Sequence, residues 1–273
     1  MTASASQPRR SIFSPGVFDR VRRYLPPAAV FVVVLIAWEI YYSGGGFFNP
    51  VPTPSAIGSA LVEEWGVLWP AAFNTIVEAL GGLAIGATAG VTVGFLTSRW
   101  AIARDILLPL AIGASTIPII AIAPILNGWF GILNPLSKMM MAALLVFFPV
   151  VINVTRGLVE VGPAKLELMR SYAADETTIM RKLRVPHMLP FFFTALKVGA
   201  TLAFIGAIVA EFFGGNANVI GQLVMSKISA GQFDAAWAAI IIGAVAAMGA
   251  YLAVTLVERA VIPWYWHIHD EPE

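Results

Sequence analysis

The sequence predicts an all-α polytopic membrane protein of about six transmembrane helices. Of its 273 residues, 58% are hydrophobic and only 12% are charged, which is about half the charged fraction of an ordinary soluble domain. Long uncharged runs, several of them near the ~20 residues that cross a bilayer, favour a lipid environment. A net charge of +1 gives no strong field for nucleic acid, and the absence of cysteine excludes disulfides and thiolate chemistry.

The apolar runs place the six expected spans in order along the chain. They cover about residues 26–42, 72–97, 106–126, 136–155, 189–213 and 235–257. A short helix is expected at 55–65, with Ser55 as its N-cap. The third span contains Pro109, Pro118 and Pro124, so irregular backbone is expected at membrane depth.

The predicted domain organisation follows from these spans. We expect a cytoplasmic amino-terminal arm (1–24), a transmembrane domain (25–262) with a cytoplasmic loop at 156–188, and a cytoplasmic tail (263–273). Lys and Arg gather in the arm, around Arg99 and Arg104, in the loop and at Arg259, whereas the intervening loops are poor in both. This bias predicts that both termini are cytoplasmic, in a multi-pass protein of the plasma (inner) membrane.

The loop between the fourth and fifth spans is the most informative segment. Helix-favouring residues run from Lys165 to Met180 with an apolar face, and the pairs Val185-Pro186 and Leu189-Pro190 are expected to stop this helix. A short amphipathic helix at this place lies on the lipid surface or docks on a partner. Composition alone favours the lipid surface.

The order of residues in this loop resembles a known motif. Glu167-Leu-Met-Arg-Ser-Tyr-Ala173, nine further residues, then Leu183-x-Val185-Pro186 and Pro190 are similar to the EAA loop of binding-protein-dependent ABC transporter permeases. The family has Gly at Ala173 and Leu at Val185. Because alanine tolerates helix at least as well as glycine, we expect the element to be kept.

Other segments resemble the nitrate/sulfonate/taurine-type branch of that family. They are the proline-rich stretch 48–55, Trp129-Phe-Gly131, Phe147-Phe-Pro149 and Ala210-Glu211-Phe212. The resemblance implies the architecture of a type I ABC importer permease, in which the loop forms a coupling helix seated on a separate ATP-binding subunit.

The resemblance also implies site residues and partners. Residues at or beside the ATPase contact, within the coupling segment 165–186, would be Glu167, Ser171, Tyr172, Ala173, Ala174, Asp175 and Pro186. The expected partners are the ATPase, a second permease copy in a homodimer, an extracytoplasmic substrate-binding protein and membrane lipid, with no nucleic acid. ATP and Mg would be bound by the ATPase, and this chain would have no cofactor, metal or catalytic residue. The solute would be small and organic or anionic, either sulfonate/taurine/nitrate-like or a pyrimidine/vitamin-like heterocycle.

Polar residues inside the spans are candidates for the substrate pathway, since irregular backbone and polar groups at membrane depth are tolerated where they line a cavity. The candidates are Ser115, Thr116, Asn127, Trp129, Asn153 and Glu211. The competing interpretation for each is a helix–helix hydrogen bond or, for Glu211, an interfacial carboxylate. Glu78 and Asn74 are read as a polar helix contact, and Lys197 as a side chain that snorkels to the surface.

Two other classes of function stay open at this point. An ATP-independent secondary transporter or channel would work without a docking partner, and transport that survives the loss of ATP would support it. A membrane enzyme would need a cluster such as HExxH or a Ser/Lys pair within the spans, and we find none in the sequence.

Overall fold

The computed structural model describes residues 17–43, 51–116 and 118–264. Within these ranges the chain is helical and contains no β-strand. It divides into two compact units, residues 1–57 and 58–273. The start of the predicted arm, the part 48–50 of the proline-rich stretch and the end of the predicted tail lie outside the described residues.

The first unit holds α1 (Val17–Tyr42), whose stretch Leu25–Tyr42 is long and apolar enough to cross a membrane. This confirms the first expected span. The Glu39 carboxylate accepts hydrogen bonds from the Ser55 hydroxyl (2.6 Å) and the Ser55 N–H (3.0 Å), which ties the end of α1 to the first turn of the next helix. That helix, α2 (Pro54–Glu63), begins one residue earlier than expected.

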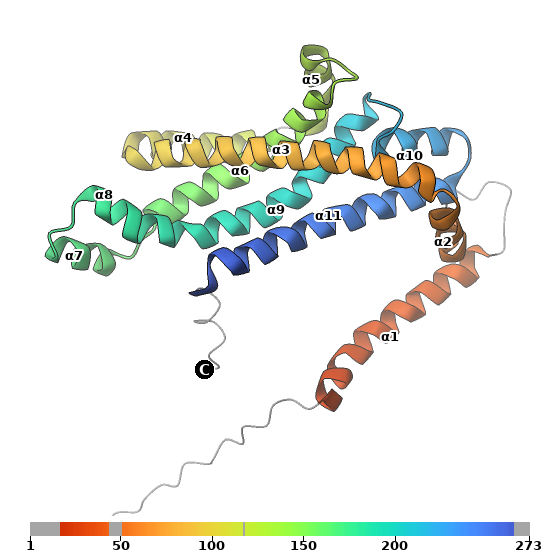
Figure 1. The fold of residues 1–273 in the computed structure, drawn as a ribbon, viewed down its shortest axis with the longest axis horizontal. Helices are drawn as coiled ribbons and strands as arrows, with labels where there is room; N and C mark the ends of the chain where they lie inside the picture. Colours follow the sequence, from red (N-terminus) through yellow and green to blue (C-terminus); the bar gives the residue numbers. More distant parts are fainter. Residues whose placement is uncertain (1–16, 44–50, 117, 265–273) are drawn as a thin grey trace, which may run out of the picture. The chain divides into compact units, whose positions relative to one another are not determined.

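Four long helices form the frame of the second unit (Figure 1). They are α3 (Trp65–Arg99), α6 (Pro135–Val159), α9 (Val185–Phe212) and α11 (Phe233–Val261). All four are long and apolar enough to cross a membrane, which confirms the second, fourth, fifth and sixth expected spans. α3 and α6 run parallel and α9 runs antiparallel to both, as successive crossings require.

The third expected span is not one continuous helix. It divides into α4 (Ala101–Ala114), the 3₁₀ turn η1 (Ile119–Ala121) and α5 (Ala123–Phe130). Pro118 lies at the break, because proline has no N–H to donate and pushes the preceding residue out of helical backbone. Pro109, within α4, and Pro124, in the first turn of α5, are tolerated.

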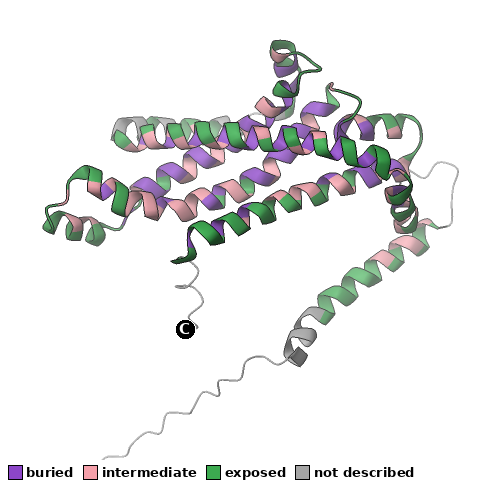
Figure 2. Cartoon of the chain, in the orientation of Figure 1, coloured by how far each residue is buried: buried purple, intermediate pink, exposed green. Residues whose placement is uncertain are grey.

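Glycines allow α3 and α6 to pack with their backbones close together. Gly82, Gly86, Gly90 and Gly94 recur every four residues on α3 and therefore share one face. A Cβ added at Gly86 would lie 2.5 Å from the Ala143 carbonyl oxygen on α6. Small residues at this spacing are typical of close helix contacts in lipid. The buried core continues from this seam onto α9 (Figure 2).

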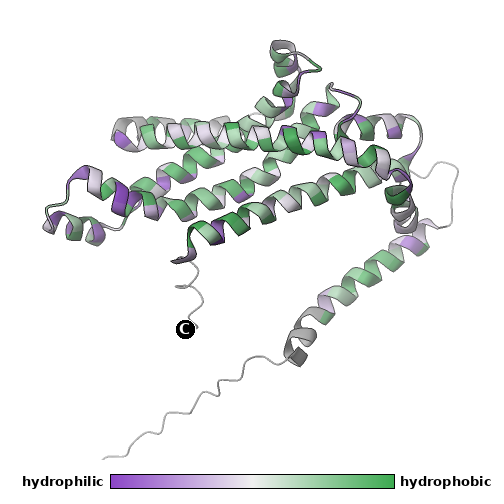
Figure 3. Ribbon diagram, viewed as in Figure 1, coloured by the Kyte–Doolittle hydropathy of each residue, from purple (hydrophilic) through white to green (hydrophobic). Residues whose placement is uncertain are grey.

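The remaining helices cap the two ends of this frame. α7 (Pro163–Ser171), α8 (Glu176–Ile179) and the π turn η2 (Met180–Arg184) lie at one end, and α10 (Ile220–Ser229) lies at the other (Figure 1). The first of these ends is the more hydrophilic, while the lengths of the helices between them are mostly hydrophobic (Figure 3).

Candidate functional site

The segment between α6 and α9 presents an exposed helix at the hydrophilic end of the second unit. α7 begins after Gly162, with Pro163 in its first turn, where the missing N–H interrupts no helical hydrogen bond. None of its residues is buried. Leu168 and, just after the helix, Tyr172 are 56% and 77% exposed. Large apolar side chains that their own chain leaves uncovered are suited to docking a partner.

α7 ends in a Schellman turn, which closes a helix with two backbone hydrogen bonds. The Ala174 N–H donates to the Met169 carbonyl (3.1 Å), and the Ala173 N–H donates to the Arg170 carbonyl (2.9 Å). Ala173 has φ of +52°, the left-handed region in which a Cβ crowds the following carbonyl. The expected continuous helix over 165–180 is therefore wrong, because the chain bends at the position where the family motif has glycine.

Asp175 starts the next helix, α8. Its carboxylate accepts a hydrogen bond from the Thr178 N–H (3.2 Å), as an N-cap does. Hydrogen bonds from the Thr178 side chain and backbone lower the pKa of Asp175 below its ordinary value, since they stabilise the ionised carboxylate. Asp175 therefore has a structural role at the centre of the predicted coupling segment.

The predicted coupling residues otherwise share an accessible position. Those exposed to solvent are Glu167, Ser171, Tyr172, Ala173 and Asp175, and those half-buried are Ala174 and Pro186. The Ser171 hydroxyl donates to the Leu168 carbonyl (2.8 Å) and so helps to close α7.

The base of the segment is fixed on the end of α6. Ile179 is buried. The Arg184 guanidinium donates to the Leu158 carbonyl (3.4 Å), and His187 Nδ1 lies 2.8 Å from the Gly157 carbonyl oxygen. The segment thus has an anchored base and an exposed tip.

Pro186 and Pro190 do not stop a helix, contrary to the sequence-based expectation. Both lie inside α9, Pro186 in its first turn. Immediately before them, the Val185 N–H donates five residues back, to the Met180 carbonyl, in the π turn. The π turn thus lies just before Pro186, and Pro190 follows one turn further along α9.

A buried polar cluster lies at the opposite end of the unit, around Glu211 near the end of α9. Glu211 is fully buried, and its carboxylate accepts hydrogen bonds from the Thr75 hydroxyl (2.8 Å) and the Gly221 N–H (2.6 Å). The Ile220 N–H donates to Thr75 Oγ1 (3.0 Å), and the Gln222 side chain donates to the Glu211 carbonyl (2.5 Å). Glu211 therefore joins α3 and the N-terminus of α10 to α9.

Two further buried charged groups, Glu78 and Lys138, belong to this cluster. Lys138 at the start of α6 is 1% exposed, donates to the Ile132 carbonyl and interacts electrostatically with Glu78 and Glu211. Sequence reasoning missed Lys138 as a site residue. Its position next to the apolar run of α6 was the available signal, because a lysine there must be buried or face an interface.

The polar contact predicted for Asn74 is confirmed. Its side-chain amide donates to the Asn218 carbonyl (2.7 Å), in the segment that leads into α10. Together with the Thr75 hydroxyl one residue on, it holds α10 against α3.

The predicted pathway residues do not come together in the described chain. The hydroxyls of Ser115 and Thr116 donate to carbonyls within the last turn of α4, at 2.6 and 2.7 Å. The amide of Asn153 donates to the Pro149 carbonyl of its own helix (2.9 Å). Trp129 is 76% exposed on α5.

The hydrogen bond of Asn127 reaches the residue that follows α9. Its amide donates to the carbonyl oxygen of Phe213 (3.4 Å), two residues after Glu211. This bond joins α5 to the end of α9, much as the competing interpretation predicted for residues of this kind.

Lys197, which was expected to extend its side chain to the membrane surface, has a partner within the protein. Its ammonium forms an ion pair with the buried carboxylate of Glu258 on α11 (2.9 Å). At the other end of the unit, Lys227 pairs with Glu64 (2.6 Å). That pair joins two loops which the sequence placed on the same side of the membrane.

Comparison with known proteins identifies the family. Residues 82–266, more than half of the chain, match the family described as "Binding-protein-dependent transport system inner membrane component". A probable ABC transporter permease protein of Haemophilus influenzae is 31% identical over 81% of this chain and 89% of its own length. The formylaminopyrimidine transport permease protein ThiX of Halalkalibacterium halodurans is 30% identical over 88% of this chain and 96% of its own length.

Other relatives are named for the transport of aliphatic sulfonates and of nitrate, at 27% and 24% identity, which confirms the predicted branch. Among solved structures, an inward-facing MetNI methionine ABC transporter matches with a TM-score of 0.52 and 19% identity, over 71% of this chain and 94% of the matched chain. That likeness confirms the type I permease fold. The chain is thus a multi-pass membrane component of a transport system rather than an enzyme, and it belongs to the family of binding-protein-dependent ABC transporter permeases.

Proposed function

We propose that this chain forms the transport path of an ATP-driven importer and receives its energy from a separate ATPase that docks on the 165–186 segment. The observation that carries the proposal is the exposed α7 with uncovered Leu168 and Tyr172, held on a base fixed to α6. A partner that moves α7 would move α6 and α9 with it, which suits the rigid-body rocking of such transporters.

The proposed orientation places the α7 end in the cytoplasm, together with both termini. Arg99, Arg156 and Arg259 lie near the ends of α3, α6 and α11 at that same end. At the other end, the basic charge of Lys227 is matched by Glu64. An excess of Lys and Arg marks the cytoplasmic side of membrane proteins.

The proposed assembly has two copies of this chain, two ATPases and an extracytoplasmic substrate-binding protein, in contact with membrane lipid. ATP and Mg would be bound by the ATPase, with no cofactor in this chain. Because Ser115, Thr116 and Trp129 are exposed in a single copy, a pathway lined by them would be completed by the second copy. Asn127, Asn153 and Glu211 already make hydrogen bonds within the chain. Asn127 and Asn153 would line that pathway through their remaining surface, whereas Glu211, which is fully buried, would support the pathway from behind its lining.

The proposed cargo is a small organic or anionic solute. Relatives named for formylaminopyrimidine, aliphatic sulfonates and nitrate support either a heterocycle or a small anion. The test is to identify, by mass spectrometry, the ligand that co-purifies with the binding protein encoded beside this chain. A ligand outside both chemical classes would contradict this part of the proposal.

The docking proposal is tested by co-purifying the ATPase with variants of the exposed tip. Truncating a well-packed interface aromatic typically costs about 2 kcal/mol or more, or roughly 30-fold in affinity. We therefore expect Tyr172→Ala to weaken ATPase binding by about that factor and to lower ATP-driven uptake in proteoliposomes. Trp65→Ala, which truncates an exposed aromatic at the opposite end, should leave ATPase binding unchanged. Equal ATPase binding by the two variants would overturn the assignment of the docking site.

A further inference from the structure

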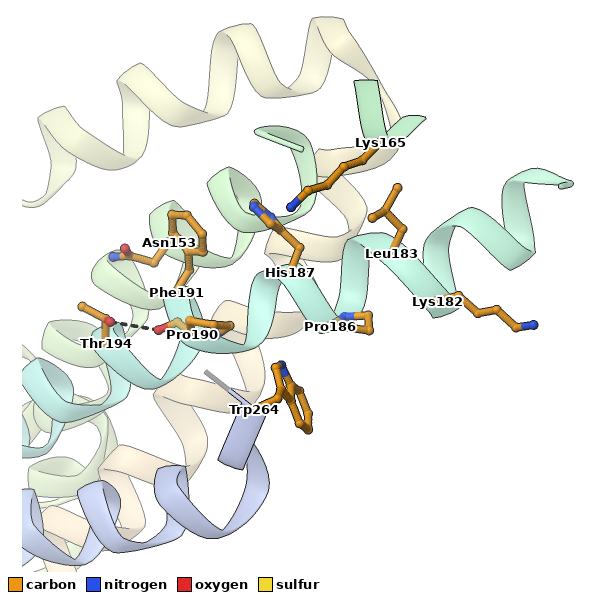
Figure 4. A pocket seen from close by; sticks show the side chains of 10 residues that line it. All are labelled: Asn153, Lys165, Lys182, Leu183, Pro186, His187, Pro190, Phe191, Thr194 and Trp264. Atoms are coloured by element: carbon orange, nitrogen blue, oxygen red, sulfur yellow. Dashed lines mark hydrogen bonds between the residues drawn. The ribbon is translucent and has the colours of Figure 1, made fainter. Parts of the chain in front are cut away.

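A cavity lies at the proposed cytoplasmic end, beside the coupling segment. Its volume is about 620 Å³, and it opens between the ends of α6, η2, α9 and the residues that follow α11. Figure 4 shows the side chains around it. It is separate from the buried cluster around Glu211, which lies at the other end of α9.

The lining of this cavity is divided by chemistry. Lys165 and Lys182 carry positive charge at the cavity, and no carboxylate lines it among the residues that the structure describes. Figure 4 shows the Lys165 side chain directed toward His187, whereas that of Lys182 extends outward. The floor is apolar and includes Phe191 and Trp264.

The polar groups along the floor are largely occupied. The Thr194 hydroxyl donates to the Pro190 carbonyl (2.8 Å), and the Asn153 amide donates to the Pro149 carbonyl (2.9 Å). His187 Nδ1 faces the Gly157 carbonyl oxygen, which can only accept, so that nitrogen is the donor of the pair. Among the described lining residues, the two lysines are therefore the positively charged groups that can attract an anion.

We infer that this cavity binds an anionic phospholipid of the cytoplasmic leaflet. The phosphate lies at Lys165, with Lys182 able to swing toward it, and the glycerol and upper acyl chain follow the apolar floor along α9. From His187 to Thr194 the helix rises about 10 Å at 1.5 Å per residue, enough to accommodate the glycerol and the first methylenes. Basic pockets between transmembrane helices on this side suit such head groups, and tryptophan is favoured at the interface.

This lipid would bridge the coupling helix and the transmembrane frame, because Lys165 belongs to α7 and the floor belongs largely to α9. The assignment of this lipid to the cytoplasmic leaflet rests on the proposed orientation. The binding test is independent of the orientation, because symmetric vesicles offer the same lipid on both sides.

The test uses the purified full-length chain in phosphatidylcholine vesicles that contain spin-labelled phosphatidylglycerol. The readout is the motionally restricted fraction of the label, which reports lipid held by the protein. A basic residue near an anionic surface contributes about 1 kcal/mol, or roughly fivefold. Lys165→Gln should weaken phosphatidylglycerol binding by about fivefold, Lys182→Gln by less, and the double variant by more than either.

Arg181→Gln is the matched control. It removes one positive charge from an exposed residue next to Lys182 that does not line the cavity, and it should change little. Thr194→Trp fills the apolar floor without altering charge, and it should also displace the lipid. Because these variants change exposed side chains, assembly measured by size-exclusion chromatography should be retained in each.

Three results would overturn the inference. The first is an equal loss of binding in Arg181→Gln, which would indicate a general surface-charge effect. The second is full competition by soluble glycerol phosphate, which would indicate a free-anion site. The third is equal restriction of spin-labelled phosphatidylcholine, which would show that the cavity does not select a charged head group.

Discussion

Replacing Ala173 by glycine should stabilise the coupling segment. The residue closes α7 with φ of +52°, and left-handed backbone costs an L-residue with a Cβ about 1–2 kcal/mol. Glycine removes that cost but adds about 0.4–1 kcal/mol of backbone entropy in the open state. The expected net gain is about 0.5–1 kcal/mol for Ala173→Gly, confined to the turn between α7 and α8.

Hydrogen exchange measures this gain directly. The Ala174 N–H donates across the turn to the Met169 carbonyl (3.1 Å), so its exchange reports opening of the Schellman motif. A gain of about 0.5–1 kcal/mol slows exchange by roughly two- to fivefold. Ala174→Gly is the control, because residue 174 is not among those with positive φ. In Ala174→Gly, glycine only adds backbone entropy to the open state, so the turn should open more readily.

Unchanged or faster exchange of the turn in Ala173→Gly would contradict a strained backbone at this residue. The same effect in both glycine variants would also contradict it, since the strain would then not belong to residue 173. Ala173→Val adds a third point in the opposite direction. A β-branched residue is a stronger outlier in left-handed backbone, so exchange should accelerate beyond that of the parent chain.

Other features of the structure give three further expectations. Gly86→Ala should destabilise the protein by about 1–3 kcal/mol, because the new methyl group overpacks against the α6 backbone. The measurement is the thermal midpoint in detergent, which should fall in Gly86→Ala but not in Gly66→Ala, where nothing lies within 4 Å. An equal loss in both variants would contradict the close α3–α6 packing. Glu211→Ala should lower stability by about 2–4 kcal/mol in the same assay, because the buried Thr75 hydroxyl and Gly221 N–H lose their hydrogen-bond partner. Glu211→Gln keeps one acceptor oxygen and should lower stability less. Equal losses in the two variants would show that these hydrogen bonds are unimportant. The lowered pKa of Asp175 means that its N-cap stabilises α8 above the ordinary carboxyl range and that this stabilisation is lost as pH falls through the lowered value. Hydrogen exchange of the α8 amides, corrected for intrinsic rates, should therefore rise only in acid. It should not rise in Asp175→Asn.

Hydrophobic length was enough to locate the long helices α3, α6, α9 and α11 from the sequence. Each is a run of apolar residues with a physical reason to be helical, since lipid offers no other partner for the backbone. Hydrophobic length did not predict the structure of the third span, which is not one continuous helix. A proline can kink a helix or divide it, and Pro118 divides this one while Pro190 does not. The proline alone does not encode which of the two outcomes occurs, because both are compatible with its missing N–H.

The functional segments divide in a similar way. The proposed coupling segment could be predicted because its residues are close in sequence, but its bend could not, because alanine at residue 173 carries no turn signal. The partners of Glu211 could not be predicted at all. Thr75 lies 136 residues away from it, and only the packing of α3 beside α9 brings the hydroxyl to the carboxylate.

Contacts to four other helices run along α9 from one end of the second unit to the other. The stretch Glu176–Phe212 runs through α8, the π turn and α9 for 37 residues, which is about 55 Å of helix at 1.5 Å per residue. Near its start it is anchored to the end of α6, near its middle Lys197 pairs with Glu258 of α11, and near its end Glu211 holds α3 and α10. Because these bonds are buried or half-buried, we expect a displacement at α8 to be carried to the opposite end of the unit. Under the proposed function, these helices would rock together when the ATPase moves α7, which is the rigid-body motion expected of such a transporter.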